Sequence, residues 1–205
     1  MTPRQGRIAI GATALIALLA GFYLARELDS KGPELASGTW LPQARPVGDF
    51  HLTDTDGHLF TARELRGKTT LVFFGFTHCP DVCPGTLAKL AQVKRASSLP
   101  LQVLFVSVDP ERDTPERLKA YVHAFDPSFI GATSDAASLA RLAAAFGVAI
   151  NRVPLPGGDY TMDHSAVLFL MDSEGQIAGL FTPPFDTGRL VEDLKRAAPY
   201  LAASD

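Results

Sequence analysis

The stretch at residues 69–84 reads TTLVFFGFTHCPDVCP and predicts a strand, a loop and the start of a helix. Its first half, 69–76, is a continuous apolar run with β-branched and aromatic residues, which predicts a central strand buried on both faces. Pro84 is tolerated only near a helix start, so a helix should begin between Cys79 and Cys83. These are the chain's two cysteines. Because residues four positions apart meet on one helix face, both sulfur atoms can point at a single bound atom.

A third ligand would complete a metal site. His164, in the motif Asp163-His164-Ser165, lies just ahead of another strand-like run that could bring it to the same end of the sheet. Thiolates and imidazole are soft or borderline donors, and two sulfurs with one nitrogen suit three-coordinate Cu(I), whereas zinc would require a fourth ligand. We therefore predict that Cys79, Cys83 and His164 bind copper, as Cu(I), Cu(II) or both.

The cysteine pair also supports other interpretations. In an exported domain such a pair is often a structural disulfide or a thiol exchanger. A Cα separation of about 6 Å at this spacing permits a bridge. We predict a redox-dependent disulfide between Cys79 and Cys83 that would control copper loading. His78 is not expected to be a ligand, and Met162 is expected to pack or to lie exposed in a loop. Asp109 is expected either to form a turn beside Pro110 or to steer a partner, and Asp113 to serve a helix start.

The remaining pattern alternates strands and helices. Strands are predicted at 101–108, 166–171 and 176–181, and helices at 84–95, 114–125, 134–146 and 187–201. A turn sequence at 54–57 between 49–53 and 57–61 predicts an N-terminal hairpin. This order is typical of an α/β, thioredoxin-like fold, and a domain of about 160 residues can bury enough surface to fold without a disulfide.

The N-terminus predicts a membrane anchor. Residues 8–25 carry no charge over 18 positions, long enough to cross most of a bilayer core, although a cleaved signal peptide is the alternative. Arg4 and Arg7 precede this span, which keeps residues 1–7 cytoplasmic by the positive-inside rule. Residues 26–48, rich in Pro and Gly, are predicted to be a tether, and 49–205 the thioredoxin-like copper-binding domain. We expect a single-pass protein of the bacterial inner membrane whose domain faces the periplasm.

Charge excludes one class of partner. The chain has 19 basic and 22 acidic residues, a net charge of −3, and its basic residues are scattered. Nucleic acid is therefore not an expected ligand.

Three motifs together resemble a known family. GFTHCPDVCP at 75–84, VSVDPERDTPE at 106–116 and DHSA at 163–166 are similar to the Sco/SenC family of membrane-tethered copper chaperones for cytochrome c oxidase assembly, over about 38–198. The resemblance implies a thioredoxin-like fold, with Cys79 and Cys83 as cysteine ligands and His164 as the distal histidine ligand.

The resemblance also implies a role and partners. The client would be the dinuclear copper centre in subunit II of cytochrome c oxidase, with an upstream periplasmic copper donor as a second partner. The protein would then be a chaperone rather than an enzyme. The alternative is a thiol-disulfide oxidoreductase that reduces the client's copper-ligand cysteines.

Overall fold

The computed structural model describes residues 19, 21 and 32–202. The folded unit begins at Pro33. The predicted anchor, 8–25, and the cytoplasmic segment, 1–7, fall outside the described residues except for Leu19 and Gly21. Within the described part of the chain, no helix combines the length and the apolar character needed to cross a membrane.

The described part contains ten strands, one short 3-10 helix and four α-helices. The strands are β1 (Gly38–Arg45), β2 (Leu52–Asp54), β3 (Leu59–Phe60), β4 (Thr69–Gly75), β5 (Leu101–Ser107), β6 (Ile130–Thr133), β7 (Ile150–Pro154), β8 (Tyr160–His164), β9 (Leu168–Met171) and β10 (Ile177–Phe181). The helices are η1 (Ala62–Leu65), α2 (Val82–Ala96), α3 (Pro115–His123), α4 (Ala136–Phe146) and α5 (Thr187–Leu201).

Eight of the strands form one sheet in the order β1-β10-β9-β4-β5-β6-β2-β3. β4 runs parallel to β5 and antiparallel to β9, and the parallel pairing continues from β5 to β6. The central strand predicted at 69–76 is confirmed as β4, which is buried on both faces. The β9–β10 hairpin and the short β2–β3 hairpin are also confirmed.

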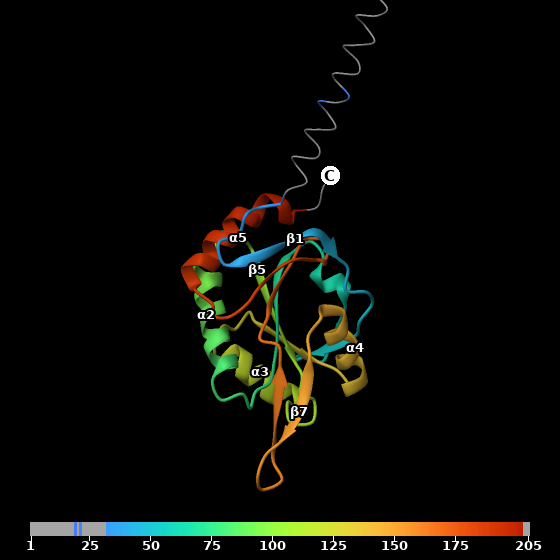
Figure 1. Cartoon of the computed structure of the whole chain (residues 1–205). Coiled ribbons are helices and arrows are strands. Elements are labelled where there is room, and N and C mark those ends of the chain that lie inside the picture. Colours follow the sequence, from blue (N-terminus) through green and yellow to red (C-terminus); the bar gives the residue numbers. More distant parts are fainter. Residues whose placement is uncertain (1–18, 20, 22–31, 203–205) are drawn as a thin grey trace, which may run out of the picture. The chain divides into compact units, whose positions relative to one another are not determined.

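Helices cover both faces of this sheet (Figure 1). Alternate residues of β4 point to opposite faces. Phe73 pairs with Phe105, which in turn packs against Tyr121 of α3. Phe74 packs edge-on against Phe146 of α4 on the other face. α2 contacts α5, and both lie on the same side of the sheet as α3, whereas α4 covers the other side. The layers are therefore those of an α/β sandwich, as predicted from the sequence.

The structure corrects the predicted tether over 32–48, whereas residues 26–31 lie outside the described residues. Residues 38–45 form β1, an edge strand that pairs antiparallel with β10. Most side chains of β1 are exposed, so no apolar alternation marks this strand in the sequence; it is held by pairing with β10 and by the half-buried side chains of Trp40 and Leu41. The buried carboxylate of Asp193 in α5 also holds this segment, accepting hydrogen bonds from the backbone N–H groups of Ala36 (2.6 Å) and Ser37 (2.8 Å).

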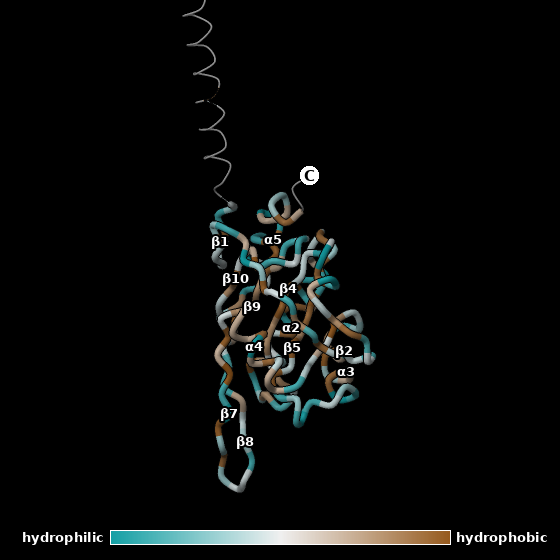
Figure 2. The backbone as a smooth tube through the Cα atoms, turned by 90° about the vertical axis from the view of Figure 1, so that its right-hand side faces the viewer, coloured by the Kyte–Doolittle hydropathy of each residue, from teal (hydrophilic) through white to brown (hydrophobic). Residues whose placement is uncertain are grey.

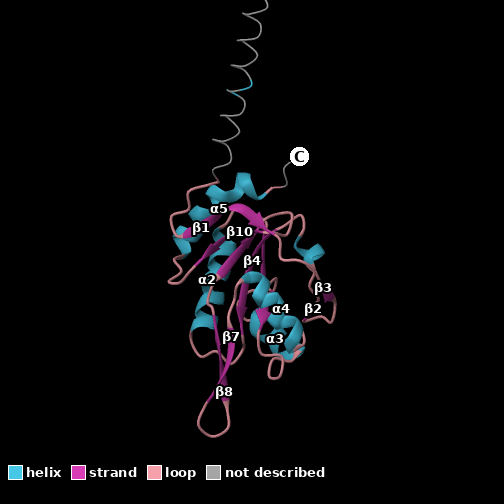
Figure 3. Ribbon diagram, turned by 45° about the vertical axis from the view of Figure 1, so that its right-hand side comes forward, coloured by secondary structure: helices cyan, strands magenta, loops and turns pink. Residues whose placement is uncertain are grey.

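The segment between the predicted helix at 134–146 and the predicted strand at 166–171, for which no strand is predicted from the sequence, forms a hairpin. Residues 150–154 and 160–164 pair as β7 and β8, a separate two-stranded sheet that projects from the body of the domain (Figure 2). Figure 3 shows the same arm from another side, at the end of the molecule opposite α5. β7 is largely exposed and β8 is mostly half-buried, and neither strand contains a fully buried residue, so hydrophobic alternation could not reveal them.

Candidate metal centre

The loop after β4 carries the first cysteine. Cys79 lies in a turn before the helix, where its N–H donates to the carbonyl of Phe76 (3.3 Å). α2 begins at Val82, and Asp81 at its N-cap makes no side-chain capping bond. The Cys79 sulfur instead accepts a hydrogen bond from the backbone N–H of Cys83 (3.3 Å). The pair therefore straddles the helix N-terminus as predicted, and the positive end of the helix dipole favours thiolate there.

Cys83 is fully buried beneath the strand. A Cβ on Gly75 would lie 2.6 Å from the Phe105 ring and 3.0 Å from Cys83 Sγ. Only glycine lets α2 approach the end of β4 this closely. Burial is also the main reason that the pKa of the Cys83 thiol is raised well above its usual range.

His164 reaches Cys83 from a distant part of the chain. It is the last residue of β8, and β9 then starts beside the end of β4, where Leu168 is paired with Phe73. His164 Nε2 lies 3.7 Å from Cys83 Sγ. The sequence prediction that His164 is brought to the same end of the sheet as the cysteines is thus what the fold produces.

Aromatic packing and one backbone contact hold the imidazole. The rings of Phe73 and Phe76 pack edge-on against it, at centroid distances of 6.2 and 6.0 Å. Its Nδ1 lies 3.3 Å from the carbonyl oxygen of Ser165, so a proton on Nδ1 leaves the Nε2 lone pair directed towards Cys83. Burial lowers the pKa of His164, which favours the neutral imidazole that a metal requires.

Cys79 is not yet in place for three-fold coordination. The ligand atoms of Cys79, Cys83 and His164 do not all lie within 4.8 Å of one another. Both cysteines are free thiols in this structure. Cys79 is half-buried, whereas Cys83 is inaccessible, so Cys79 is the one that can rotate towards an ion or meet another molecule. The predicted disulfide stays a prediction.

A second polar cluster lies beside the cysteine loop. Asp113 is buried and accepts hydrogen bonds from the Thr77 N–H (3.0 Å), the Thr77 hydroxyl (2.6 Å) and the Ser107 hydroxyl (2.6 Å). Its carboxylate therefore holds the start of the cysteine loop, while Thr114 caps α3. This corrects the assignment of Asp113 to the helix start, because the contact to Thr77 spans 36 positions.

This cluster is poorly suited to a cation. A nitrogen of His78 and carboxylate oxygens of Asp109 and Asp113 lie within 4.8 Å of one another. However, Arg112 donates to Asp109 (2.6 Å), and Arg117 Nη1 lies 3.3 Å from His78. Arg112 already pairs with the Asp109 carboxylate, and donors of Thr77 and Ser107 occupy the Asp113 carboxylate, so His78 lies in a polar network with Arg117.

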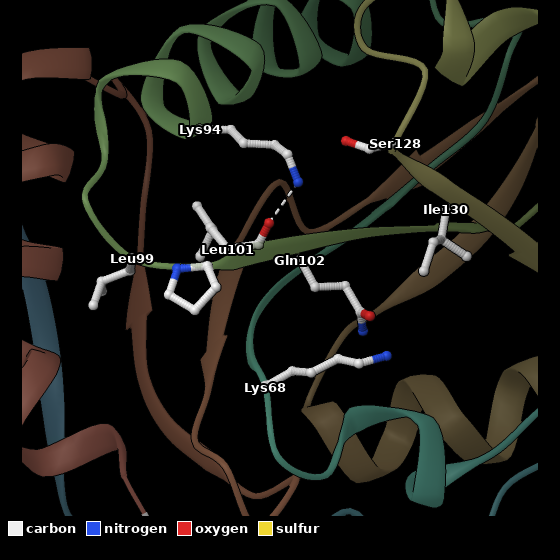
Figure 4. Close-up of a pocket in the computed structure, with 8 residues that line it drawn as sticks. Lys68, Lys94, Leu99, Leu101, Gln102, Ser128 and Ile130 are labelled. Atoms are coloured by element: carbon white, nitrogen blue, oxygen red, sulfur yellow. Dashed lines mark hydrogen bonds between the residues drawn. The ribbon is translucent and has the colours of Figure 1, made fainter.

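A hollow at the other end of the sheet is separate from this centre. It has a volume of about 440 Å³ and lies near the start of β5, between Lys68 and Lys94 (Figure 4). The Lys94 ammonium group donates to the Leu101 carbonyl (2.6 Å), so it is already engaged. Because β4 and β5 are parallel, the cysteine loop leaves the opposite end of these strands.

The chain is similar in sequence to a known protein family. The SCO1/SenC family model matches residues 40–199, which include both cysteines and His164. Over 209 residues the chain is 36% identical to the mitochondrial SCO2 homologue of Bos taurus, covering 94% of this chain and 77% of that protein. Matches to other curated relatives cover as little as 45% of their length.

Two solved structures are similar in fold. The structure of Bradyrhizobium japonicum ScoI with copper bound is 43% identical, with a TM-score of 0.67 over 73% of this chain and 98% of that chain. Arabidopsis thaliana ScoI with copper bound is 35% identical, with a TM-score of 0.71 over 75% of this chain and 98% of that chain. The thioredoxin-like α/β fold predicted from the sequence is therefore confirmed.

Proposed function

The chain belongs to the SCO1/SenC family, and on this premise we propose that it is a copper metallochaperone. It binds one copper ion through Cys79, Cys83 and His164, and delivers copper to, or prepares, the dinuclear copper centre of cytochrome c oxidase subunit II. The observation that carries the proposal is the 3.7 Å approach of His164 Nε2 to Cys83 Sγ, between residues 81 positions apart.

The donor set fits copper. Two thiolates and one imidazole are soft or borderline ligands that suit Cu(I) without a fourth donor. The buried Cys83 sulfur and the neutral imidazole form a preorganised half of the site, and the half-buried Cys79 closes it by rotating away from the Cys83 N–H. Binding releases thiol protons, because only thiolate coordinates the ion.

The exposed side of the site supports transfer. Cys79 and its neighbour Val82, which is 47% exposed, lie at the surface, so a client's cysteines can approach the ion from the Cys79 side. A three-coordinate ion leaves room for an incoming thiolate, and ligand exchange can then proceed without releasing free copper.

Metal titration of single variants tests the site. Wild-type protein, reduced beforehand, should bind one equivalent of Cu(I), and Cys79→Ser, Cys83→Ser and His164→Ala should each lose stoichiometric binding. His58→Ala is the matched control, because this imidazole is exposed in the β2–β3 turn. Full copper retention by His164→Ala would refute the third-ligand assignment.

The second candidate function is thiol-disulfide exchange, in which the protein reduces the client's copper-ligand cysteines. One observation favours it: Cys79 is half-buried at a helix N-terminus, whereas Cys83 is buried behind it. This is the arrangement of an attacking thiol and a resolving thiol. Two incubations discriminate the two functions. Metal-free reduced protein is mixed with an oxidised subunit II peptide, where thiol-disulfide exchange supports the reductase. Copper-loaded protein is mixed with the reduced peptide, where copper transfer supports the chaperone.

The location is a proposal of its own. Residues 8–25 would anchor the protein in the bacterial inner membrane, with 1–7 in the cytoplasm and the domain in the periplasm. Protease added to spheroplasts of cells that express the full chain should then digest the domain, whereas a cytoplasmic control protein stays intact. Protection of the domain would contradict this orientation.

A further inference from the structure

We propose that Tyr160 and Asp109 are positioning residues for His164, because the hydrogen bond between them fixes the β7–β8 hairpin so that the imidazole stays beside Cys83. The inference rests on the proposed copper site, and it assigns a role to residues that coordinate nothing.

The β7–β8 hairpin needs a tertiary contact to hold it in a fixed position relative to the domain. Within the described residues, β7 and β8 pair only with each other, and the arm projects from the domain (Figure 3). An isolated two-stranded hairpin is only marginally stable in water. His164 ends β8, so any swing of the arm moves the imidazole relative to Cys83, which is fully buried in the core.

Tyr160 supplies the contact at the right place. Side chains alternate along a strand, so positions 160, 162 and 164 of β8 share one face. The Tyr160 hydroxyl donates to Asp109 (2.7 Å), a residue that is only 3% exposed. The guanidinium groups of Arg112 and Arg152 lie on the Tyr160 ring, 3.7 and 3.6 Å from its centroid.

Hydrogen bonds and an ion pair of two arginines stabilise the contact between Tyr160 and Asp109. Arg112 donates to Asp109 through Nε (2.6 Å) and to the Tyr160 carbonyl through Nη1 (2.9 Å). Arg152 of β7 is paired with Glu111, at 2.9 Å. Both strands of the hairpin are therefore tied to the loop that follows β5.

The same loop also holds the cysteine segment. The Ser107 hydroxyl accepts from the Asp109 N–H (3.1 Å) and donates to Asp113, whose carboxylate holds Thr77. Residues 107–113 thus fix two segments at once: Thr77 lies two positions before Cys79, and Tyr160 lies four positions before His164. This loop sets the distance between the cysteines and the histidine.

Tyr160→Phe tests the inference, because it removes the hydroxyl and leaves the ring between the two guanidinium groups. Tyr200→Phe is the matched control, since Tyr200 packs on Trp40 at the far end of the domain. Three measurements on the full chain apply: Cu(I) affinity by competition with a chromophoric chelator, nitrogen hyperfine structure in the electron paramagnetic resonance spectrum of the Cu(II) form, and amide hydrogen exchange of the metal-free protein.

We expect Tyr160→Phe to weaken Cu(I) binding about 10-fold, the lower end of what loss of an orienting partner produces. The nitrogen hyperfine pattern should become heterogeneous, and amides 161–164 should exchange faster, whereas Tyr200→Phe should match wild type in all three. Wild-type affinity in Tyr160→Phe would overturn the inference, and so would weaker binding with an unchanged nitrogen signal. If the wild-type protein bound no copper, the proposed function would fail, and the metal-free exchange rates would still decide whether Tyr160 fixes the hairpin.

Discussion

Replacing Gly75 by alanine should destabilise the domain, because the added Cβ would clash with the Phe105 ring beside Cys83. The added Cβ would lie 2.6 and 2.9 Å from two carbons of the Phe105 ring and 3.0 Å from Cys83 Sγ. Carbon atoms normally meet at about 3.5–4.0 Å, so the ring must move by roughly 1 Å. Phe105 is fully buried between Phe73 and Tyr121, at centroid distances of 6.0 and 5.8 Å, so these two rings oppose its movement.

The magnitude follows from two opposing effects. Overpacking a close-packed core costs about 1–3 kcal/mol. Alanine offsets about 0.5–1 kcal/mol of this by restricting the unfolded chain. We therefore expect Gly75→Ala to lower the free energy of unfolding by about 1–2 kcal/mol, which is a fall of about 3–6 °C in Tm for a domain of this size.

Gly85→Ala provides the matched control. Gly85 lies in the first turn of α2, ten positions from Gly75, and a Cβ there would meet nothing within 4 Å. The same substitution should therefore stabilise the protein by about 0.5–1 kcal/mol. Urea unfolding of the reduced full chain in a mild detergent, followed by circular dichroism, measures both variants. A Gly75→Ala midpoint equal to or above that of wild type would refute the close-packing argument.

Three further predictions concern other parts of the molecule. Hydrogen bonds from Thr61 lower the pKa of Glu64 from 4.5 to about 2. Glu64 therefore stabilises the fold above pH 4.5, and this contribution is lost as the pH falls towards 2. In Glu64→Gln the free energy of unfolding should depend less on pH between 2 and 4.5. Asp193→Ala should lower the free energy of unfolding by about 2–4 kcal/mol, measured by urea unfolding, because three donors of Ala36 and Ser37 lose a buried acceptor. Asp193→Asn, which keeps one acceptor oxygen, should lower the free energy of unfolding less. Cu(I) in 100-fold excess over its Kd should raise the unfolding free energy by about 2.7 kcal/mol, and a Cu(I) chelator should reverse the rise in Tm measured by calorimetry.

The central parts of the fold could be predicted from the sequence because their signals are local. The apolar run of β4 and the proline at position 84 predict a strand, a loop and a helix start. Thr114 predicts the N-cap of α3, and Gly147 ends α4 with φ 73°. In each case the physical preference belongs to a few neighbouring residues, so no knowledge of distant contacts was needed.

Tertiary structure decided the rest, since it depends on pairings between distant residues. β1 and β7 expose most of their side chains and β8 is mostly half-buried, so these strands are defined mainly by the pairing of β1 with β10 and of β7 with β8. The sequence identified both cysteines and His164. Only the antiparallel pairing of β9 with β4 places the imidazole beside Cys83, and only the structure shows that the Cys79 sulfur accepts from the Cys83 N–H and lies outside this group. Residue types and their spacing determine which atoms can bind a metal. The packing of β4, β8 and the loop at 107–113 determines that His164 Nε2 and Cys83 Sγ lie close together. The sequence could not show this, because strand direction and close packing act over the whole domain.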